Sequence, residues 1–228
     1  MDETRKVETR AKALKPLRKF GKMLVGSVLA AGIMLAASKP SRASSVELMA
    51  GNERSTLDLK ASAPVNDKLG VFMRARPSVD YKGVISSYGL ADLVLNLSNG
   101  LDAISEVRAF GGNVVPRAGM RYSAKTENVS LCTVATIGLD SKPYFESLTL
   151  LGYFPTIYKT LKLFAQVENI SDVSATGHDS SKQRIRLGVE QGGWGAGAAV
   201  DLTETGNSPT IANGTFDWNA GGYVSRKF

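Results

Sequence analysis

The chain has 228 residues, a mass of 24.3 kDa and a formal net charge of +7, enough for one domain with a sizeable core or for one membrane-spanning barrel. Hydrophobic residues make up 43% and charged residues 21% of the sequence, which excludes a wholly disordered chain. The single cysteine, Cys132, and single histidine, His178, exclude an intrachain disulfide, a multi-histidine zinc site and a CxxC redox site. The mean hydropathy of −0.07 is too low for a bundle of transmembrane helices, but not for strands of alternating polarity.

The positive charge is confined to the N-terminal segment. Residues 1–43 hold ten Lys or Arg against three Asp or Glu, whereas residues 44–228 hold 18 of each sign. The pI of about 9.5 therefore reflects this segment alone and does not indicate nucleic-acid binding.

Residues 1–43 have the pattern of a secretory signal peptide. A basic region over 5–22 precedes fifteen uncharged residues, 23–37, and small residues then stand at the −3 and −1 positions of a cleavage site after Ala43. We predict cleavage there, with Ala37 as the second choice. The alternatives are an amphipathic transit peptide and an uncleaved anchor, although fifteen helical residues span only about 22 Å of a ~30 Å hydrocarbon core.

From residue 45 onward, apolar and polar residues alternate with the period of two that is typical of strands. Turn sequences such as Asn99-Gly100 and Gly192-Gly193 recur about every twelve residues, as in a meander of short hairpins. The pattern predicts twelve strands, with ten as the alternative count. The predicted strands are 45–50, 55–63, 68–77, 84–97, 101–111, 115–124, 128–138, 144–153, 160–170, 182–191, 194–203 and 216–228.

The length of these strands favours a membrane barrel over a soluble one. Many have ten or more residues, which a tilted strand needs to cross a bilayer, whereas strands of soluble proteins average five or six. Aromatic residues also stand near strand ends, where membrane barrels place their interfacial girdles; they are Phe145, Tyr153, Trp194, Phe216 and Trp218. We therefore expect an all-β fold, a closed antiparallel up-and-down transmembrane β-barrel over residues 44–228.

The second face of the same strands is charged and would line the lumen of such a barrel. Its basic residues are Lys60, Arg74, Arg76, Arg108, Arg117, Arg121, Lys162, Arg184 and Arg186, and its acidic residues are Asp58, Asp92, Glu106, Glu146, Glu168, Glu190 and Asp201. Stripes of arginine could draw anions through a pore. Alternatively, the two signs pair and fill the interior, because buried charges need partners.

The chain ends Gly222-Tyr223-Val224-Ser225-Arg226-Lys227-Phe228, and Phe228, Val224 and Ala220 share one face of the last predicted strand. With the signal peptide and the alternating strands, this end resembles that of bacterial outer-membrane β-barrel proteins as a general class, although Arg226 stands where an apolar residue is common. The resemblance covers residues 44–228. It implies an outer-membrane location, the lipid bilayer as a partner, and recognition of the strand ending at Phe228 by the barrel-assembly machinery.

In such a barrel both ends of the mature chain lie on the periplasmic side, so the strand number is even. The two longest predicted connections, 171–181 and 204–215, then lie outside the cell. His178 stands in the first of them. It could act as the base for Ser174, Ser180 or Ser181 in a lipid-modifying enzyme at the outer rim, although polar loops with one histidine are usually no more than loops.

We expect a porin-like outer-membrane channel for small solutes, with a mild preference for anions, rather than an enzyme. The alternatives are a non-conducting structural or surface-display barrel, a rim-located lipid hydrolase or acyltransferase that uses His178, and a soluble periplasmic lipocalin-like barrel. In the soluble barrel the charged face would be the wet surface. No cofactor, metal or nucleic-acid partner is expected, and Cys132, which alternates onto the charged face, is expected to be an inert thiol.

Overall fold

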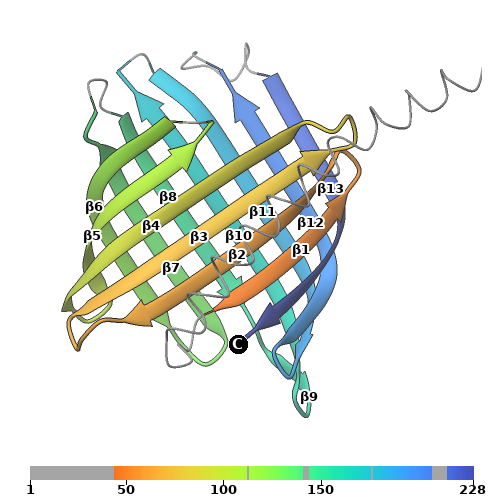
Figure 1. The fold of residues 1–228 in the computed structure, drawn as a ribbon. Helices are drawn as coiled ribbons and strands as arrows, with labels where there is room; N and C mark the ends of the chain where they lie inside the picture. The colour runs from red at the N-terminus through yellow and green to blue at the C-terminus, as the bar shows by residue number, and fades with distance from the viewer. Residues whose placement is uncertain (1–43, 112, 141–143, 176, 207–214) are drawn as a thin grey trace, which may run out of the picture.

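The computed structural model describes residues 44–111, 113–140, 144–175, 177–206 and 215–228. These residues form strands only (Figure 1). The strands are β1 (Ser45–Gly51), β2 (Arg54–Pro64), β3 (Leu69–Asp80), β4 (Ile85–Ser98), β5 (Leu101–Phe110), β6 (Asn113–Lys125), β7 (Val129–Gly138), β8 (Tyr144–Tyr153), β9 (Thr156–Tyr158), β10 (Leu161–Ser174), β11 (Gly177–Gln191), β12 (Trp194–Thr205) and β13 (Thr215–Lys227).

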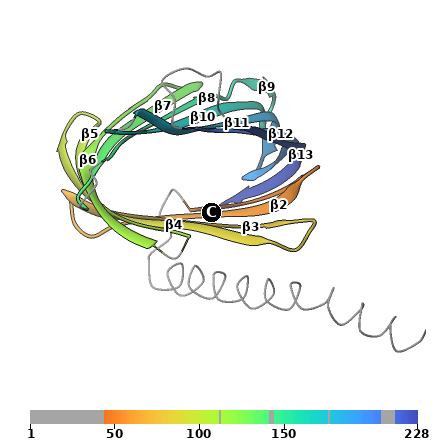
Figure 2. The same ribbon diagram turned by 90° about the horizontal axis from the view of Figure 1, so that it is seen from above.

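The sheet closes on itself because its first and last strands pair. β1 runs antiparallel to β13, from Ser45 opposite Lys227 to Gly51 opposite Gly221. The remaining strands pair in chain order, and the three-residue β9 pairs only with the start of β10. The described chain is therefore an antiparallel barrel of twelve strands with β9 as an appendage, and it is oval when seen along its axis (Figure 2).

Both ends of the described chain lie at one end of the barrel, which we call the proximal end. The Phe228 N–H donates to the Ser44 carbonyl across 3.0 Å, and the opposite end is called distal. The predicted fold class and the number of barrel strands are confirmed, and this is the fold that the resemblance to outer-membrane barrels implies. The separate strands on either side of residues 51–54 are confirmed as well.

The prediction of an eleven-residue connection over 171–181 is wrong. β10 continues to Ser174 and β11 begins at Gly177, directly opposite, with a register shift between Asp172 and Val173. The sequence pattern did not reveal this hairpin, because most of its side chains are polar on both faces. The alternation of apolar and polar residues therefore stops although the strands continue. Of the connection 204–215, residues 207–214 lie outside the described residues, as do the predicted signal peptide and its cleavage site.

The outer face of the barrel is apolar between two sets of aromatic side chains. Leu93, Leu95, Ile185 and Leu187 are among its exposed aliphatic residues. Exposed aromatic residues stand outward at both ends, Tyr122, Tyr153, Trp194 and Phe228 proximally and Phe145, Phe216 and Trp218 distally. All five predicted girdle residues are thus at strand ends and exposed, in the arrangement typical of membrane barrels. In the described ranges no helix is long and apolar enough to cross a membrane.

Arg226 departs from the expected terminal pattern, and the structure explains how it is accommodated. Its guanidinium lies 5.0 Å from the ring centre of Trp194 and 5.9 Å from that of Phe228. It also donates to the Gly192 carbonyl across 2.6 Å. An arginine on the outer face is tolerated here because its charge reaches the interface over aromatic rings.

The distal end of the closing seam depends on one buried amide. Asn219 on β13 is fully buried and its Oδ1 accepts from the backbone N–H groups of Glu53 and Arg54 at 3.0 and 3.1 Å. Its Nδ2 donates to the Arg54 carbonyl at 3.2 Å. A Cβ at Gly51 would lie 2.2 Å from Asn219 Oδ1, so the turn between β1 and β2 requires glycine there.

We predict that Asn219→Ala lowers the free energy of unfolding by about 1–3 kcal/mol, because two backbone donors and one acceptor lose their buried partner. The temperature at which the barrel loses its folded mobility on a denaturing gel measures the change. Asn96→Ala, at an exposed amide, is the matched control and should leave that temperature unchanged. Equal behaviour of the two variants would contradict the role given to Asn219.

Candidate functional site

The interior of the barrel is filled in layers, and the proximal layer is aromatic. Phe154, Phe164 and Tyr223 form a row with ring-centre distances of 5.3 and 5.9 Å, and Met49 packs into the same cluster. The Lys227 ammonium lies over the rings of Phe154 and Phe164 at 5.4 and 5.3 Å. Near the proximal end, one side of the lumen is therefore filled by apolar side chains, and the Lys227 ammonium lies against them.

Next to the aromatic layer lies a network of charged side chains, which we call the central network. Arg74 on β3 forms a bidentate pair with Asp58 on β2 at 2.9 and 2.7 Å. Arg184 on β11 donates to the same Asp58 at 3.0 Å and to Glu168 at 2.7 Å. The strand alternation places all four side chains inward, where they are almost completely buried.

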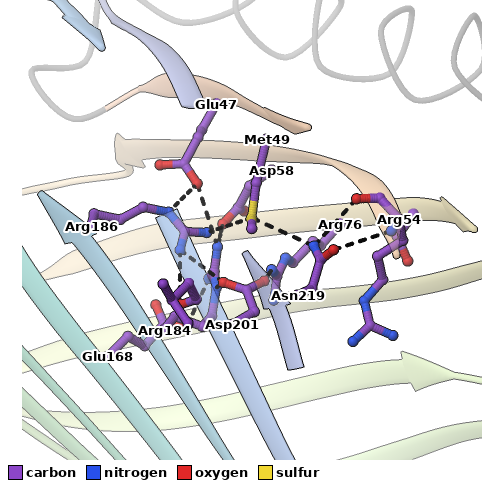
Figure 3. Close-up of polar contacts among 12 residues, drawn as sticks. Glu47, Met49, Arg54, Asp58, Arg76, Glu168, Arg184, Arg186, Asp201 and Asn219 are labelled. Carbon is purple, nitrogen blue, oxygen red and sulfur yellow. Dashed lines mark hydrogen bonds and ion pairs between the residues drawn. The ribbon is translucent and has the colours of Figure 1, made fainter. Parts of the chain in front are cut away.

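Some of these ion pairs cross the lumen. Arg74 contacts Glu168 on β10 at 3.2 Å, and β3 and β10 are separated by five barrel strands on each side in the closed order. Arg76 on β3 reaches Asp201 on β12 at 2.5 Å. The central network therefore ties opposite walls of the oval together across its short dimension (Figures 2 and 3).

The central network also extends to the first strand. Arg186 donates to Glu47 on β1 at 2.9 Å and to Asp201 at 2.8 Å (Figure 3). Two carboxylates, those of Asp58 and Glu168, are each shared by two guanidinium groups, those of Arg74 and Arg184. Each of these two carboxylates therefore offsets charge on both arginines.

A second set of ion pairs, the lateral network, fills the side of the barrel lined by β5, β6 and β8. Arg117 lies between Glu106 at 2.8 Å and Glu146 at 3.0 Å. Arg108 is paired with Glu146 through both terminal nitrogens. Nearer the proximal end, Arg121 pairs with Asp102 at 2.8 Å. Asp92, opposite Glu106 in the register of β4 and β5, is also buried.

Most of the sequence-predicted lumen residues thus lie inside and are paired with one another. Lys60 and Arg121 are paired but remain 27% exposed. Lys162 and Glu190 stand at the proximal mouth, opposite one another in register, and Glu190 pairs with Lys227 instead. Cys132 shares the inner face, in register with Ser123.

Several interior residues were missed by the sequence reasoning. Glu47 lies on a short strand that is apolar around it, Asp172 belongs to the segment predicted as a connection, and Asn219 is uncharged. Lys182 is the first residue of the predicted strand 182–191 and has the same parity as Arg184, so it could have been found. Asp102 could have been found, because it has the same parity as Glu106 and Arg108. The predicted lumen residues included nine basic and only seven acidic side chains. The missed acids Glu47, Asp102 and Asp172 offset this excess of positive charge.

A cavity of about 350 Å³ opens at the distal end, above the lateral network. It lies between the ends of β4, β5, β6, β8, β10 and β11. Its lining residues are Tyr88, Arg108, Phe110, Asn113, Val115, Tyr144, Glu146, Ile170, Asp172, Asp179, Ser180 and Lys182. The interior therefore runs from a polar distal cavity, past ion pairs, to an aromatic proximal layer.

His178 stands in the distal hairpin and contacts one of the three serines that the sequence offered. Its Nε2 lies 2.7 Å from the Ser181 hydroxyl, which is 3.1 Å from that of Ser171. Ser174 donates to Asp179 and Ser180 to Asp172. Among the described residues, no carboxylate is hydrogen-bonded to the imidazole.

No protein-family model and no curated protein matches the chain. Among solved structures it is similar to the KdgM porin, with 12% identity, a TM-score of 0.49 and coverage of 82% of this chain and 99% of that one. LpxR from Salmonella typhimurium has 7% identity and a TM-score of 0.47, with coverages of 82% and 100%. OmpT, an outer membrane protein of Vibrio cholerae in its trimer form, has 11% identity and a TM-score of 0.39, with coverages of 81% and 96%. At these scores the likenesses carry no argument about function.

We predict that Glu168→Gln destabilises the barrel by about 3–5 kcal/mol, because Arg74 and Arg184 are left with too few carboxylates in a buried site. Urea unfolding of the detergent-refolded protein, followed by gel mobility, measures the change. Glu190→Gln is the matched control, since its partner Lys227 has a side chain that is 48% exposed, and we expect at most about 1 kcal/mol. A similar small loss for both variants would show that the central network carries little stability.

Proposed function

We propose that the protein is an outer-membrane channel of low conductance for small solutes, in which the central network is the constriction. The closed barrel, the apolar outer band and the two aromatic girdles support a place in a bilayer. The signal-peptide pattern of residues 1–43 and the terminal Phe228 support export to the outer membrane, with the described proximal end on the periplasmic side.

The observation that carries this proposal is the set of guanidinium–carboxylate contacts between opposite walls, above all Arg74 with Glu168. A barrel that only had to be filled could use apolar side chains, since replacing buried ion pairs by well-packed apolar residues is often neutral or stabilising. Buried N–H groups of Arg76, Arg117 and Arg184 have no hydrogen-bond partner among the described residues. Such groups are normally satisfied by water, so we expect a hydrated layer through which small solutes pass.

The proposed channel has little charge preference. The sequence predicted a mild preference for anions from its arginine stripes, but these arginines are paired, and Glu47, Asp102 and Asp172 add acidic groups to the interior. Paired charges of both signs leave a weak net field along the lumen. We therefore expect a reversal potential close to zero in a salt gradient.

We predict that the refolded chain conducts in planar lipid bilayers with small, resolvable steps, and that Arg74→Ser combined with Glu168→Ser raises the conductance severalfold. The double change removes one cation and one anion, so it widens the constriction without altering the net charge. Arg226→Ser, on the outer face, is the control and should not change the step size.

Folding of each variant is checked first by gel mobility. If the first pair prevents folding, Arg76→Ser with Asp201→Ser removes the other pair that joins β3 to a distant strand. A folded, inserted wild-type chain without any conductance above that of bare lipid would overturn the proposal in favour of a non-conducting barrel.

A hydrolase acting on lipid is the second candidate, and the contact between His178 Nε2 and the Ser181 hydroxyl supports it. A nucleophile within hydrogen-bond reach of an imidazole is the minimum arrangement for acyl transfer. Ser181 is on the outward face of β11 at the distal end, on the side that would meet lipid. We rank it second because, among the described residues, no acid hydrogen-bonds to His178.

This candidate predicts release of fatty acid from phospholipid vesicles that is lost in Ser181→Ala and in His178→Gln. Ser174→Ala is the matched control, because this serine is bonded to Asp179 rather than to His178 in the structure. Mass spectrometry of the extracted lipids measures the reaction. Intact lipid after prolonged incubation with the folded wild-type chain would remove the candidate.

A further inference from the structure

The distal cavity carries one cation without an ion-pair partner. Lys182 on β11 lines the cavity, and its ammonium lies 5.4 Å from the ring centre of Phe110. Among the described residues, no carboxylate lies within ion-pair distance of this ammonium. The positive charge is therefore held at the cavity wall by an aromatic face and is available to an anionic group.

The same wall carries one carboxylate oxygen without a hydrogen-bond partner. Asp172 on β10 accepts from the Ser180 hydroxyl through Oδ2 at 2.9 Å. Its Oδ1 is buried and has no hydrogen-bond partner among the described residues, although Arg108 Nη1 lies at ion-pair distance from it, 4.0 Å away. A buried carboxylate oxygen of this kind favours a ligand that donates a hydrogen bond or carries positive charge.

The register places these two groups side by side. Asp172 stands opposite Ser180, and Lys182 stands opposite Ile170, so Asp172 and Lys182 are diagonal neighbours on the inner face of two paired strands. A cation without an ion-pair partner beside a carboxylate oxygen without a hydrogen-bond partner matches a ligand with the opposite arrangement, an anionic group beside an ammonium.

The other walls restrict the ligand further. Val115, Ile170 and Phe110 supply apolar surface, while Arg108 and Glu146 are already bonded to each other. A ligand with only negative charge would face Asp172 and Asp179, and one with only positive charge would face Lys182 and Arg108. The volume of about 350 Å³ lies at the small end of the ~300–1,000 Å³ typical of ligand pockets.

We propose that the distal cavity is a binding site for a small zwitterion of the α-amino-acid type with an apolar or aromatic side chain. The ligand carboxylate pairs with Lys182, the ligand ammonium pairs with Asp172, and the side chain packs against Val115, Ile170 and Phe110. This site does not require the barrel to conduct, so it stands or falls independently of the proposed channel.

Equilibrium dialysis of the detergent-refolded full chain against labelled phenylalanine tests the proposal. We expect saturable binding, with phenylpropionate and phenethylamine competing at least about tenfold more weakly, because each lacks one of the two charge-assisted contacts. Lys182→Met and Asp172→Asn should each weaken phenylalanine binding at least about tenfold. Lys182→Met should not weaken the binding of phenethylamine, which separates loss of the contact from loss of the fold.

Two variants serve as matched controls. Lys162→Met changes a lysine on the inner face at the opposite end of the barrel, and Asp67→Asn changes an exposed aspartate in the connection between β2 and β3. Both should bind phenylalanine as the wild type does. Absence of saturable phenylalanine binding, equal competition by phenylpropionate, or unchanged binding in Lys182→Met would each overturn the proposal.

Discussion

The interior of this barrel depends on ion pairs, because a charge that is taken out of water is costly unless an opposite charge lies beside it. Asp58, Glu168 and Asp201 each contact more than one basic side chain, and the partners come from strands far apart in the closed order. The charged groups thereby act as cross-links between walls, in addition to the backbone ladder that joins neighbouring strands. Removal of a single partner therefore lowers the stability of the fold, because the remaining buried charge is neither paired nor hydrated.

Both the outer face and the inner contents follow from one strand geometry. Successive side chains point to opposite faces of a strand. In β11 this alternation places Leu187 and Val189 outward and Arg184 and Arg186 inward. The outer band can therefore match lipid while the interior holds ion pairs, aromatic rings and a polar cavity. In such a fold the inner side chains and the strand ends are available for function, because the outer side chains form the apolar band.

The distal end combines the chemically distinctive groups. It holds the cavity with Lys182 and Asp172, the contact between His178 and Ser181, and the turn secured by Asn219. The two distal hypotheses use opposite faces of the same hairpin. Lys182 and Asp172 point into the lumen, and Ser181 points away from it, so binding in the cavity and chemistry on the lipid side involve different side chains and are separable by mutation.

The barrel and most of its inner face could be predicted from the pattern of residues along the chain. Alternation over segments of ten or more residues is sufficient to locate strands and to assign faces, since the period of two is a local property of the backbone. It failed at 171–181, where both faces are polar, and at Glu47, where one acid stands in a short apolar strand.

Which of these charged side chains contact one another depends on how the barrel closes. Arg74 and Glu168 lie 94 positions apart, and nothing in the local pattern of either strand specifies that closure brings them into contact across the lumen. The aromatic proximal layer, the distal cavity and the choice of Ser181 over Ser174 and Ser180 as the neighbour of His178 depend equally on closure and register. Side-chain parity is local, whereas the distance between two walls is set by the strand number, the oval cross-section and the way in which the inner side chains pack.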